Sequence, residues 1–328
     1  MATRFDIIGI GNAIVDVVAR VDEVFLSRHD MRKGSMTLVD AADAERLYAA
    51  MPAGEESSGG SAANTCAVAA ALGARVAYLG KVADDPLGRV FRHDIMAAGV
   101  HFPSAPAREG APTARCLILV TPDGQRTMHT YLGASVAFAK RDVDGALIAD
   151  GAVLYLEGYL FDPPAAQAAF RAAATAARAA GRRVALSLSD PFCVERHRDA
   201  FRALVRGGVD ILCANEAEVT SLYQVNSLAE AVEAARAEVG LAALTQSEAG
   251  SLIVHGNETV RVPAAPARVV DTTGAGDAYA AGFLAGLTSG RDIRDCGRLG
   301  ALAAAEVIGH YGARPQADLR RLAAAAGL

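Results

Sequence analysis

Short apolar runs alternate with amphipathic helical segments through the second half of the chain, and this alternation restricts the possible fold most strongly. The expected strands are 153–156, 184–188, 210–213 and 242–245, and helices are expected between them near 164–180, 196–206 and 228–239. Strands that are separated by helices pair in parallel, and the helices cover both faces of the resulting sheet. The pattern therefore predicts an α/β fold with a mostly parallel central sheet.

The first part of the chain adds a strand at 6–10 and a hairpin whose arms, 115–120 and 127–131, flank the turn Thr121-Pro122-Asp123-Gly124. Proline fixes φ in such a turn and glycine accepts a positive φ. Segments near 12–39 and 104–133 are expected to form a small β-sheet that acts as a lid over a cleft. We expect a single α/β domain over residues 1–328. The remaining expected elements are helices 64–72, 87–98, 275–287 and 295–308, strand 76–79 and hairpin 250–262.

Charge and composition exclude several classes of protein. The chain has 32 Lys+Arg and 37 Asp+Glu, so its net charge is 32 − 37 = −5, which argues against an extended nucleic-acid-binding surface. Its apolar runs are too short to span a bilayer, and its N-terminus lacks the features of a signal peptide. The five cysteines form no Cys-x-x-Cys pair. We therefore expect a cytoplasmic protein that binds neither membranes nor nucleic acid.

The first glycine cluster, Gly9-Ile10-Gly11-Asn12, follows a strand and superficially matches a dinucleotide-binding turn. That fingerprint requires a small residue where Ile14 stands. A P-loop is excluded because none of the three lysines, Lys33, Lys81 and Lys140, follows the required glycine pattern. Ligands of open α/β sheets bind at the carboxyl ends of strands, so Asn12 and Asp16 are candidates to face a cleft. The alternative is that Asp16 is a solvated turn residue.

Two further motifs place small residues immediately before a helix. Gly59-Gly60-Ser61-Ala62-Ala63-Asn64 lets the backbone approach a ligand, and Asn64 offers both a donor and an acceptor. The alternative is a flexible loop with a helix cap.

In the second motif, Asp271–Leu284, the small residues Gly274, Ala275 and Gly276 precede an apolar helix. Backbone amides at such a helix start form an anion hole, and Asp277 beside it can accept a proton. The alternative is a glycine-rich turn with an aspartate that interacts with the helix dipole.

These motifs resemble the signatures of the PfkB/ribokinase family of carbohydrate and nucleoside kinases. Residues 271–277 resemble the C-terminal signature and 59–64 the N-terminal one, within a similarity that extends from Gly9 to about Pro315. Several stretches are more similar to the adenosine-kinase branch, namely 11–16, 188–192, 209–218 and 245–246. The resemblance implies a ribokinase-like α/β fold with a small β-sheet lid.

The resemblance also implies a role for each matching residue. Asp277 would be the general base, and Gly274, Ala275 and Gly276 would form the anion hole. The implied substrate contacts are Asn12, Asp16, Gly60, Ser61 and Asn64, with Cys116 and Tyr159 lining a base pocket. The implied ATP contacts are Asn215, Glu218, Thr245 and Thr273, and Glu218 would help to position Mg²⁺ indirectly.

The chain departs from the family pattern at Ser247, where relatives usually have glycine two residues after the threonine that corresponds to Thr245. This puts the backbone path near the ATP phosphates in doubt. Arg126 on the expected lid could reach a phosphate, or it could be a solvated hairpin residue. The implied cofactors are ATP and Mg²⁺, and activation by K⁺ is left open.

We therefore expect an ATP-dependent kinase that phosphorylates the 5′-hydroxyl of a nucleoside, with adenosine as the first candidate. One alternative is a sugar kinase of the same family that acts on ribose, fructose or a related sugar. The other is a non-catalytic nucleoside-binding protein, against which the intact Asp277 and anion hole speak. Base specificity and the choice between monomer and homodimer are left open by the sequence.

Overall fold

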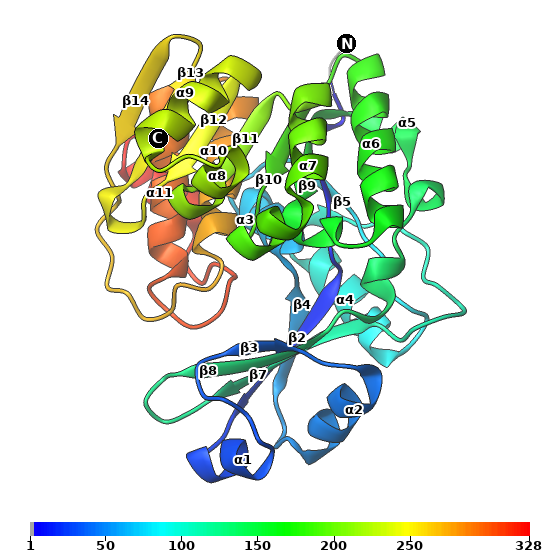
Figure 1. The fold of residues 1–328 in the computed structure, drawn as a ribbon. Helices are drawn as coiled ribbons and strands as arrows, with labels where there is room; N and C mark the ends of the chain where they lie inside the picture. Colours follow the sequence, from blue (N-terminus) through cyan, green and yellow to red (C-terminus); the bar gives the residue numbers. More distant parts are fainter. Residues whose placement is uncertain (1–2) are drawn as a thin grey trace.

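The computed structural model describes residues 3–328, so Met1 and Ala2 of the predicted 1–328 domain lie outside the described residues. Its centre is a nine-stranded sheet in the order β14-β13-β12-β11-β10-β9-β1-β5-β6 (Figure 1). Neighbours from β6 to β12 pair in parallel, whereas β13 and β14 are antiparallel. The strands are β1 Phe5–Ile10, β5 Val76–Leu79, β6 Val100–His101, β9 Gly151–Glu157, β10 Arg183–Ser187, β11 Ile211–Asn215, β12 Leu241–Thr245, β13 Ser251–His255 and β14 Glu258–Val262.

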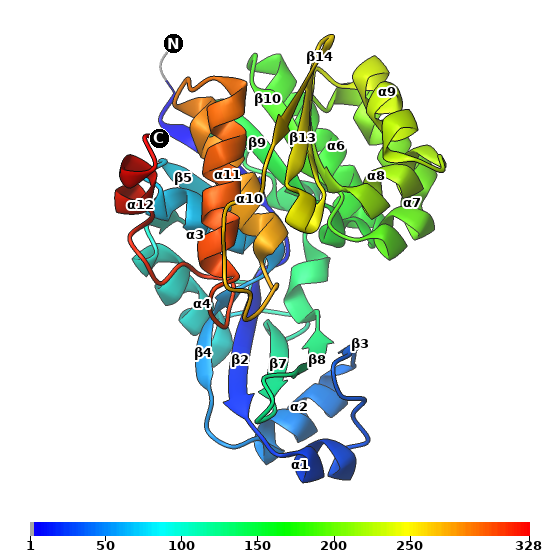
Figure 2. The ribbon, with the colours of Figure 1, turned by 90° about the vertical axis from the view of Figure 1, so that its left-hand side faces the viewer.

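Helices cover both faces of this sheet because successive strand residues point to opposite sides. Ile7 packs into one hydrophobic cluster and its neighbour Ile8 into the other. The first cluster is completed by α3 Ser61–Ala71, α4 Pro86–Ala97, α10 Ala275–Thr288, α11 Ile293–Val307 and α12 Leu319–Ala325 (Figure 2). The second is completed by α5 Gly145–Ala149, α6 Pro164–Ala179, α7 Pro191–Gly208, α8 Glu216–Tyr223 and α9 Leu228–Glu238.

A second, five-stranded sheet lies beyond the carboxyl end of β1, in the order β3-β8-β7-β2-β4 (Figure 2). Its strands are β2 Ile14–Arg20, β3 Met36–Leu38, β4 Glu55–Gly59, β7 Ala114–Val120 and β8 Arg126–Tyr131. The helices α1 Glu23–Arg28 and α2 Ala41–Ala50 lie at its far end, and α2 packs on β7 and β8. We refer to these five strands as the small sheet.

The predicted fold class is confirmed: the large sheet is mostly parallel, helices cover both its faces, and a smaller sheet accompanies it. The small sheet contains one strand outside the segments near 12–39 and 104–133. This strand is β4, which pairs antiparallel with β2 although Glu55–Ser58 are polar. The helix expected at 196–206 begins earlier, at Pro191, because the Asp190 carboxylate caps it by accepting from the amides of Phe192 and Cys193.

The structure also describes the lengths of the helices and the state of the cysteines. Among residues 3–328, every helix falls short of the length and apolar character that a bilayer crossing requires. All five cysteines are buried free thiols that contribute to packing.

Candidate active site

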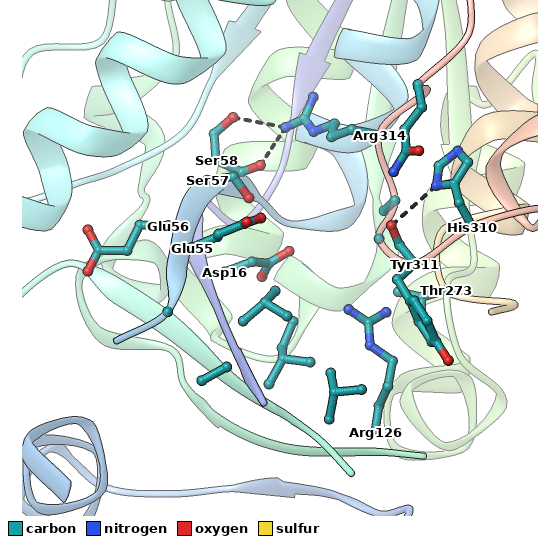
Figure 3. A pocket seen from close by; sticks show the side chains of 18 of the residues that line it. Asp16, Glu55, Glu56, Ser57, Ser58, Arg126, Thr273, His310, Tyr311 and Arg314 are labelled. Atoms are coloured by element: carbon teal, nitrogen blue, oxygen red, sulfur yellow. Dashed lines mark hydrogen bonds between the residues drawn. The ribbon is translucent and has the colours of Figure 1, made fainter. Parts of the chain in front are cut away.

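A cavity of about 1680 Å³ lies between the small sheet and the elements at the carboxyl edge of the large sheet. Its walls come from β2, β4, β7 and β8 on one side and from α3, α4 and the loop after α11 on the other. Asp16, Arg126 and Arg314 surround it (Figure 3). Of the predicted site residues, Asp16, Asn64 and Thr273 line this cavity.

The start of α10 provides unpaired backbone donors close to the cavity. Gly274 is its N-cap with φ +76°, and a Cβ there would lie 2.5 Å from Ala313 Cβ, so only glycine fits. Within the described chain, the amides of Gly276 and Asp277 have no hydrogen-bond acceptor. The Ala275 amide, which was expected in the anion hole, instead donates to the carbonyl oxygen of Thr272 at 3.2 Å. Free amides at the positive end of a 14-residue helix favour a bound anion.

Asp277 lies in the first turn of α10 and is held by two donors from α3. Ser61 Oγ donates to Oδ1 at 2.6 Å, and Asn64 Nδ2 donates to Oδ2 at 3.3 Å. Burial raises the pKa of Asp277 to about 6, against the lowering effect of these two hydrogen bonds. The carboxylate is therefore mostly ionised at neutral pH and can accept a proton.

Gly60 allows α3 to begin where it brings Ser61 and Asn64 to Asp277. Its φ is +97°, and a Cβ there would lie 2.1 Å from the carbonyl oxygen of Asn12. In this structure Gly60 therefore permits close approach between its own segment and the segment that contains Asn12, which is a contact within the protein.

Asp16 projects from β2 into the cavity, where no side chain or amide of the described residues donates a hydrogen bond to it. A Cβ on Gly59 of the paired strand β4 would lie 2.3 Å from Asp16 Oδ2, so glycine makes room for the carboxylate. Burial raises the pKa of Asp16 to about 6, although the positive charge of Arg314 opposes this. A carboxylate with both oxygens free can accept two neighbouring hydroxyl groups.

Arg314, in the loop after α11, was not identified from the sequence. Its Nη2 donates to the carbonyl oxygen of Ser58 at 2.7 Å and to Ser58 Oγ at 2.9 Å (Figure 3). Its Nη1 donates to the Ala63 carbonyl oxygen at 3.1 Å. Asp94 Oδ2 accepts from the amide of Ser58 at 2.8 Å. Arg314 thus joins β4 to α3 and places a positive charge near both Asp16 and Asp277.

Glu157, the last residue of β9, was also missed. Its side chain is 1% exposed, and it accepts hydrogen bonds from Asn12 and from the amide of Ala62 at the start of α3. A carboxylate at the end of an otherwise apolar strand was the signal that could have identified it.

Three of the residues expected to contact ATP lie outside the lining of the cavity, whereas the fourth, Thr273, is part of it. Asn215 and Thr245 end β11 and β12, and Glu218 lies in the first turn of α8. Asn215 caps α8 in a capping box: its Oδ1 accepts from the Glu218 amide at 2.9 Å. Both oxygens of Glu218 accept in return, Oε2 from the Asn215 amide at 3.0 Å and Oε1 from Asn215 Nδ2 at 2.7 Å. Burial raises the pKa of Glu218 to about 7. Thr245 ends β12 opposite Asn215, and Ser247 follows with a φ of +49°.

The two residues expected around a base pocket are not part of the cavity lining. Cys116 on β7 is buried beside Asp16 in the parallel register and accepts from Thr130 Oγ1 at 3.2 Å. Burial raises the pKa of Cys116 to about 12, so it is an uncharged thiol. Tyr159, in a short 3₁₀ helix after β9, is 42% exposed, and its charged neighbours include Asp190 and Asp277.

Arg126 and Asp271 connect the small sheet to the loop that precedes α10. Arg126 Nη1 donates to Asp271 Oδ2, and both side chains are buried, so Arg126 is not a solvated hairpin residue. Asp271 Oδ1 accepts from the amide of Thr273 at 3.0 Å and from Thr273 Oγ1 at 2.7 Å. Asp271 therefore holds Thr273 beside the helix start.

Comparisons with known proteins agree on one family. The model of the pfkB family of carbohydrate kinases matches residues 34–319. An adenosine kinase from Sinorhizobium meliloti is 51% identical, with 98% of this chain and 99% of that chain covered at a TM-score of 0.90. A probable sugar kinase from Rhizobium etli CFN 42 is 49% identical, with 99% of both chains covered at a TM-score of 0.91. Adenosine kinase 1 of Arabidopsis thaliana is 26% identical over 93% of this chain and 94% of its own length.

Proposed function

The chain belongs to the pfkB family of carbohydrate kinases, which act with ATP on hydroxyl groups, and we propose that its acceptor is the 5′-hydroxyl of a nucleoside, adenosine. The observation that carries this proposal is the position of Asp277. Its carboxylate is fixed by Ser61 and Asn64 in the helical turn where the amides of Gly276 and Asp277 have no acceptor within the described chain. Such amides suit an anionic group.

In the proposed reaction, Asp277 accepts the proton of the attacking hydroxyl as that oxygen forms a bond to the γ-phosphorus and ADP leaves. The amides of Gly276 and Asp277 stabilise the negative charge on the transferred group. Catalysis of this kind depends mainly on holding the hydroxyl and the phosphoryl group in line. Closure of the small sheet over the cavity would exclude water, which competes as an acceptor.

The start of α10 and the Asn215–Glu218 pair can accommodate ATP with a bound Mg²⁺ ion. The free amides of α10 suit an anionic phosphate. Mg²⁺ binds through one or two carboxylates together with substrate phosphates and waters, and it neutralises charge on the phosphates when bound. Both oxygens of Glu218 are engaged by Asn215, which supports an indirect role for Glu218 in placing the ion.

The lining of the cavity favours a nucleoside over a free sugar. The diol-binding candidate Asp16 lies beside an apolar wall that continues along β2 and β7 through Val18, Ile118 and Val120. A hydroxyl-rich sugar would leave this wall without a partner, whereas a base would cover it. The relatives that carry the name adenosine kinase support the same choice.

A sugar kinase is the second candidate, because the probable sugar kinase from Rhizobium etli is almost as similar to this chain. ADP release by the purified protein distinguishes the candidates when adenosine, ribose and fructose are supplied separately with Mg·ATP. We expect kcat/KM to be highest for adenosine. Turnover of ribose or fructose with none of adenosine would overturn the nucleoside assignment, and tight binding without turnover of any would favour a binding protein.

A further inference from the structure

Glu157 is a buried carboxylate that has no part in the reaction described above, yet it connects two segments of the site. Oε1 accepts from the amide of Asn12 at 3.0 Å and from Asn12 Nδ2 at 2.8 Å. Oε2 accepts from the amide of Ala62 at 2.7 Å. The carboxylate thus holds the segment after β1 and the start of α3 against the end of β9.

The first consequence concerns the orientation of the Asn12 amide. Because Nδ2 donates to Glu157, the remaining polar atom, Oδ1, is fixed as an acceptor, and it has no donor in the described chain. Asn64 repeats this arrangement: its Nδ2 donates to Asp277, and its Oδ1 has no donor there. Asn12 and Asn64 are 2% and 6% exposed. A buried acceptor without a donor is costly, so both oxygens favour a ligand that brings O–H or N–H donors.

The second consequence concerns the position of α3. Its N-cap is Gly60, which has no side chain to accept from the first-turn amides, and Glu157 supplies the acceptor for Ala62. The same turn carries Ser61 and Asn64, which hold Asp277. A Cβ on Gly11 would lie 2.2 Å from Glu157 Oε2, so the glycine after β1 makes room for this carboxylate.

We propose that Glu157 is a positioning residue that fixes the Asn12 amide and the start of α3, so that the amide oxygens of Asn12 and Asn64 join the Asp16 carboxylate as the set of acceptors that faces the vicinal hydroxyls of the substrate. This proposal rests on the proposed function. Burial raises the pKa of Glu157 to about 7. Only the ionised form accepts from all three donors, because protonation turns one oxygen into a donor.

Glu157→Gln tests the proposal, because a glutamine keeps the shape of the side chain and replaces one acceptor by a donor. The variant must place Nε2 either against the Ala62 amide or against the backbone amide of Asn12, and in the second case the Asn12 side-chain amide turns over. We expect KM for adenosine to rise about 10- to 100-fold, as for loss of a hydrogen bond to a charged group, with a much smaller change in kcat. The matched control is Glu238→Gln at the end of α9, which removes the charge of a carboxylate that accepts from Arg202 and Arg206 outside the cavity lining.

The decisive readout compares adenosine with 2′-deoxyadenosine and 3′-deoxyadenosine. In the wild type we expect at least one deoxynucleoside to lose kcat/KM about tenfold or more, and in Glu157→Gln we expect this discrimination to shrink. Gly11→Ala, which displaces the same carboxylate, should reproduce that pattern, whereas Glu238→Gln should keep the wild-type ratio.

Unchanged discrimination and KM in both site variants would overturn the proposal. So would an equal loss for all three nucleosides that parallels a fall in Tm, because that pattern belongs to a purely structural helix cap. Failure of the wild type to phosphorylate adenosine would instead contradict the proposed function, so the two failures are distinct.

Discussion

Arg126 of the small sheet and Asp271 of the loop before α10 form a buried ion pair, with side chains that are 8% and 7% exposed. Asp271 also accepts from the amide of Gly312 at 3.1 Å and from Thr273. One carboxylate therefore organises the loop before α10 and attaches it to the small sheet. Removing either member of the pair leaves a buried charge without a partner.

We predict that Asp271→Asn and Arg126→Met each lower the free energy of unfolding by about 3 kcal/mol. The double variant should lose less than the sum of the two, because it leaves neither charge unpaired. Urea denaturation of the four proteins measures this coupling. Losses that simply add would show that the pair contributes little in solution.

Two glycines at the start of α10, the N-cap Gly274 and the first-turn residue Gly276, are expected to differ in what they support. Gly274→Ala places a methyl group 2.5 Å from Ala313 Cβ at a φ of +76°, so we expect a loss of about 2 kcal/mol in stability together with a large fall in kcat. A Cβ on Gly276 meets nothing within 4 Å. Gly276→Ala should therefore keep the wild-type Tm and lower kcat/KM for ATP, because its methyl group occupies space beside the free amides. Equal Tm losses in both variants would contradict this distinction.

Activity should begin to fall as the pH drops below about 7, where Glu157 takes up a proton, and should fall more steeply below about 6. Burial raises the pKa of both Asp16 and Asp277 to about 6, and both carboxylates act in the ionised form. A plot of log kcat/KM for adenosine against pH should therefore descend with a slope above one. Arg314→Gln should move this descent to higher pH, because the arginine charge lowers both pKa values. An unshifted profile would show that Arg314 does not act on these groups.

Protonation of the same two carboxyls, Asp16 and Asp277, lowers activity but should raise the free energy of unfolding. Their pKa values rise from 3.8 in the unfolded reference to about 6 in the folded protein, so the folded state binds more protons between these values. Their contribution to the free energy of unfolding is fully present below pH 3.8 and is lost as the pH rises through 6. Urea midpoints of Asp16→Asn should accordingly vary less with pH over this window than those of the wild type.

Ser247 adopts a φ of +49°, a left-handed conformation that glycine adopts without strain. We expect Ser247→Gly to leave stability within about 1 kcal/mol of the wild type, since relief of strain offsets the greater entropy of an unfolded glycine. Ser247→Val should cost more, because a β-branched residue is strongly disfavoured there. Urea midpoints and KM for ATP check both variants, and a stable Ser247→Val protein would contradict the strained conformation.

The parallel sheet was predictable because its strands are apolar runs separated by helices, and the start of α10 because small residues precede a helix. The positive φ of Ser247 explains why glycine suits this position in relatives, and serine adopts the same conformation at a cost. β4 was not predictable from local sequence, because Glu55–Ser58 are polar and become a strand only through pairing with β2.

The residues that support the site were harder to find than those in its motifs. Glu157 contacts Asn12 across 145 positions, and Arg314 contacts Ser58 across 256 positions. No local pattern records such contacts, because they arise when strand ends meet at one edge of the sheet. The expectation that Tyr159 and Cys116 line a base pocket stays a prediction, and neither residue lies in the cavity wall.

The central claim is that Asp277, held by Ser61 and Asn64, removes the proton from the acceptor hydroxyl. Asp277→Asn keeps the size of the side chain and removes its capacity as a base. The most direct test is kcat of this variant with adenosine and Mg·ATP at pH 7.5, beside the affinity for adenosine from calorimetry. We predict a fall in kcat of about 10²- to 10⁴-fold with adenosine still bound. A kcat equal to that of the wild type would contradict the assignment of Asp277 as the base.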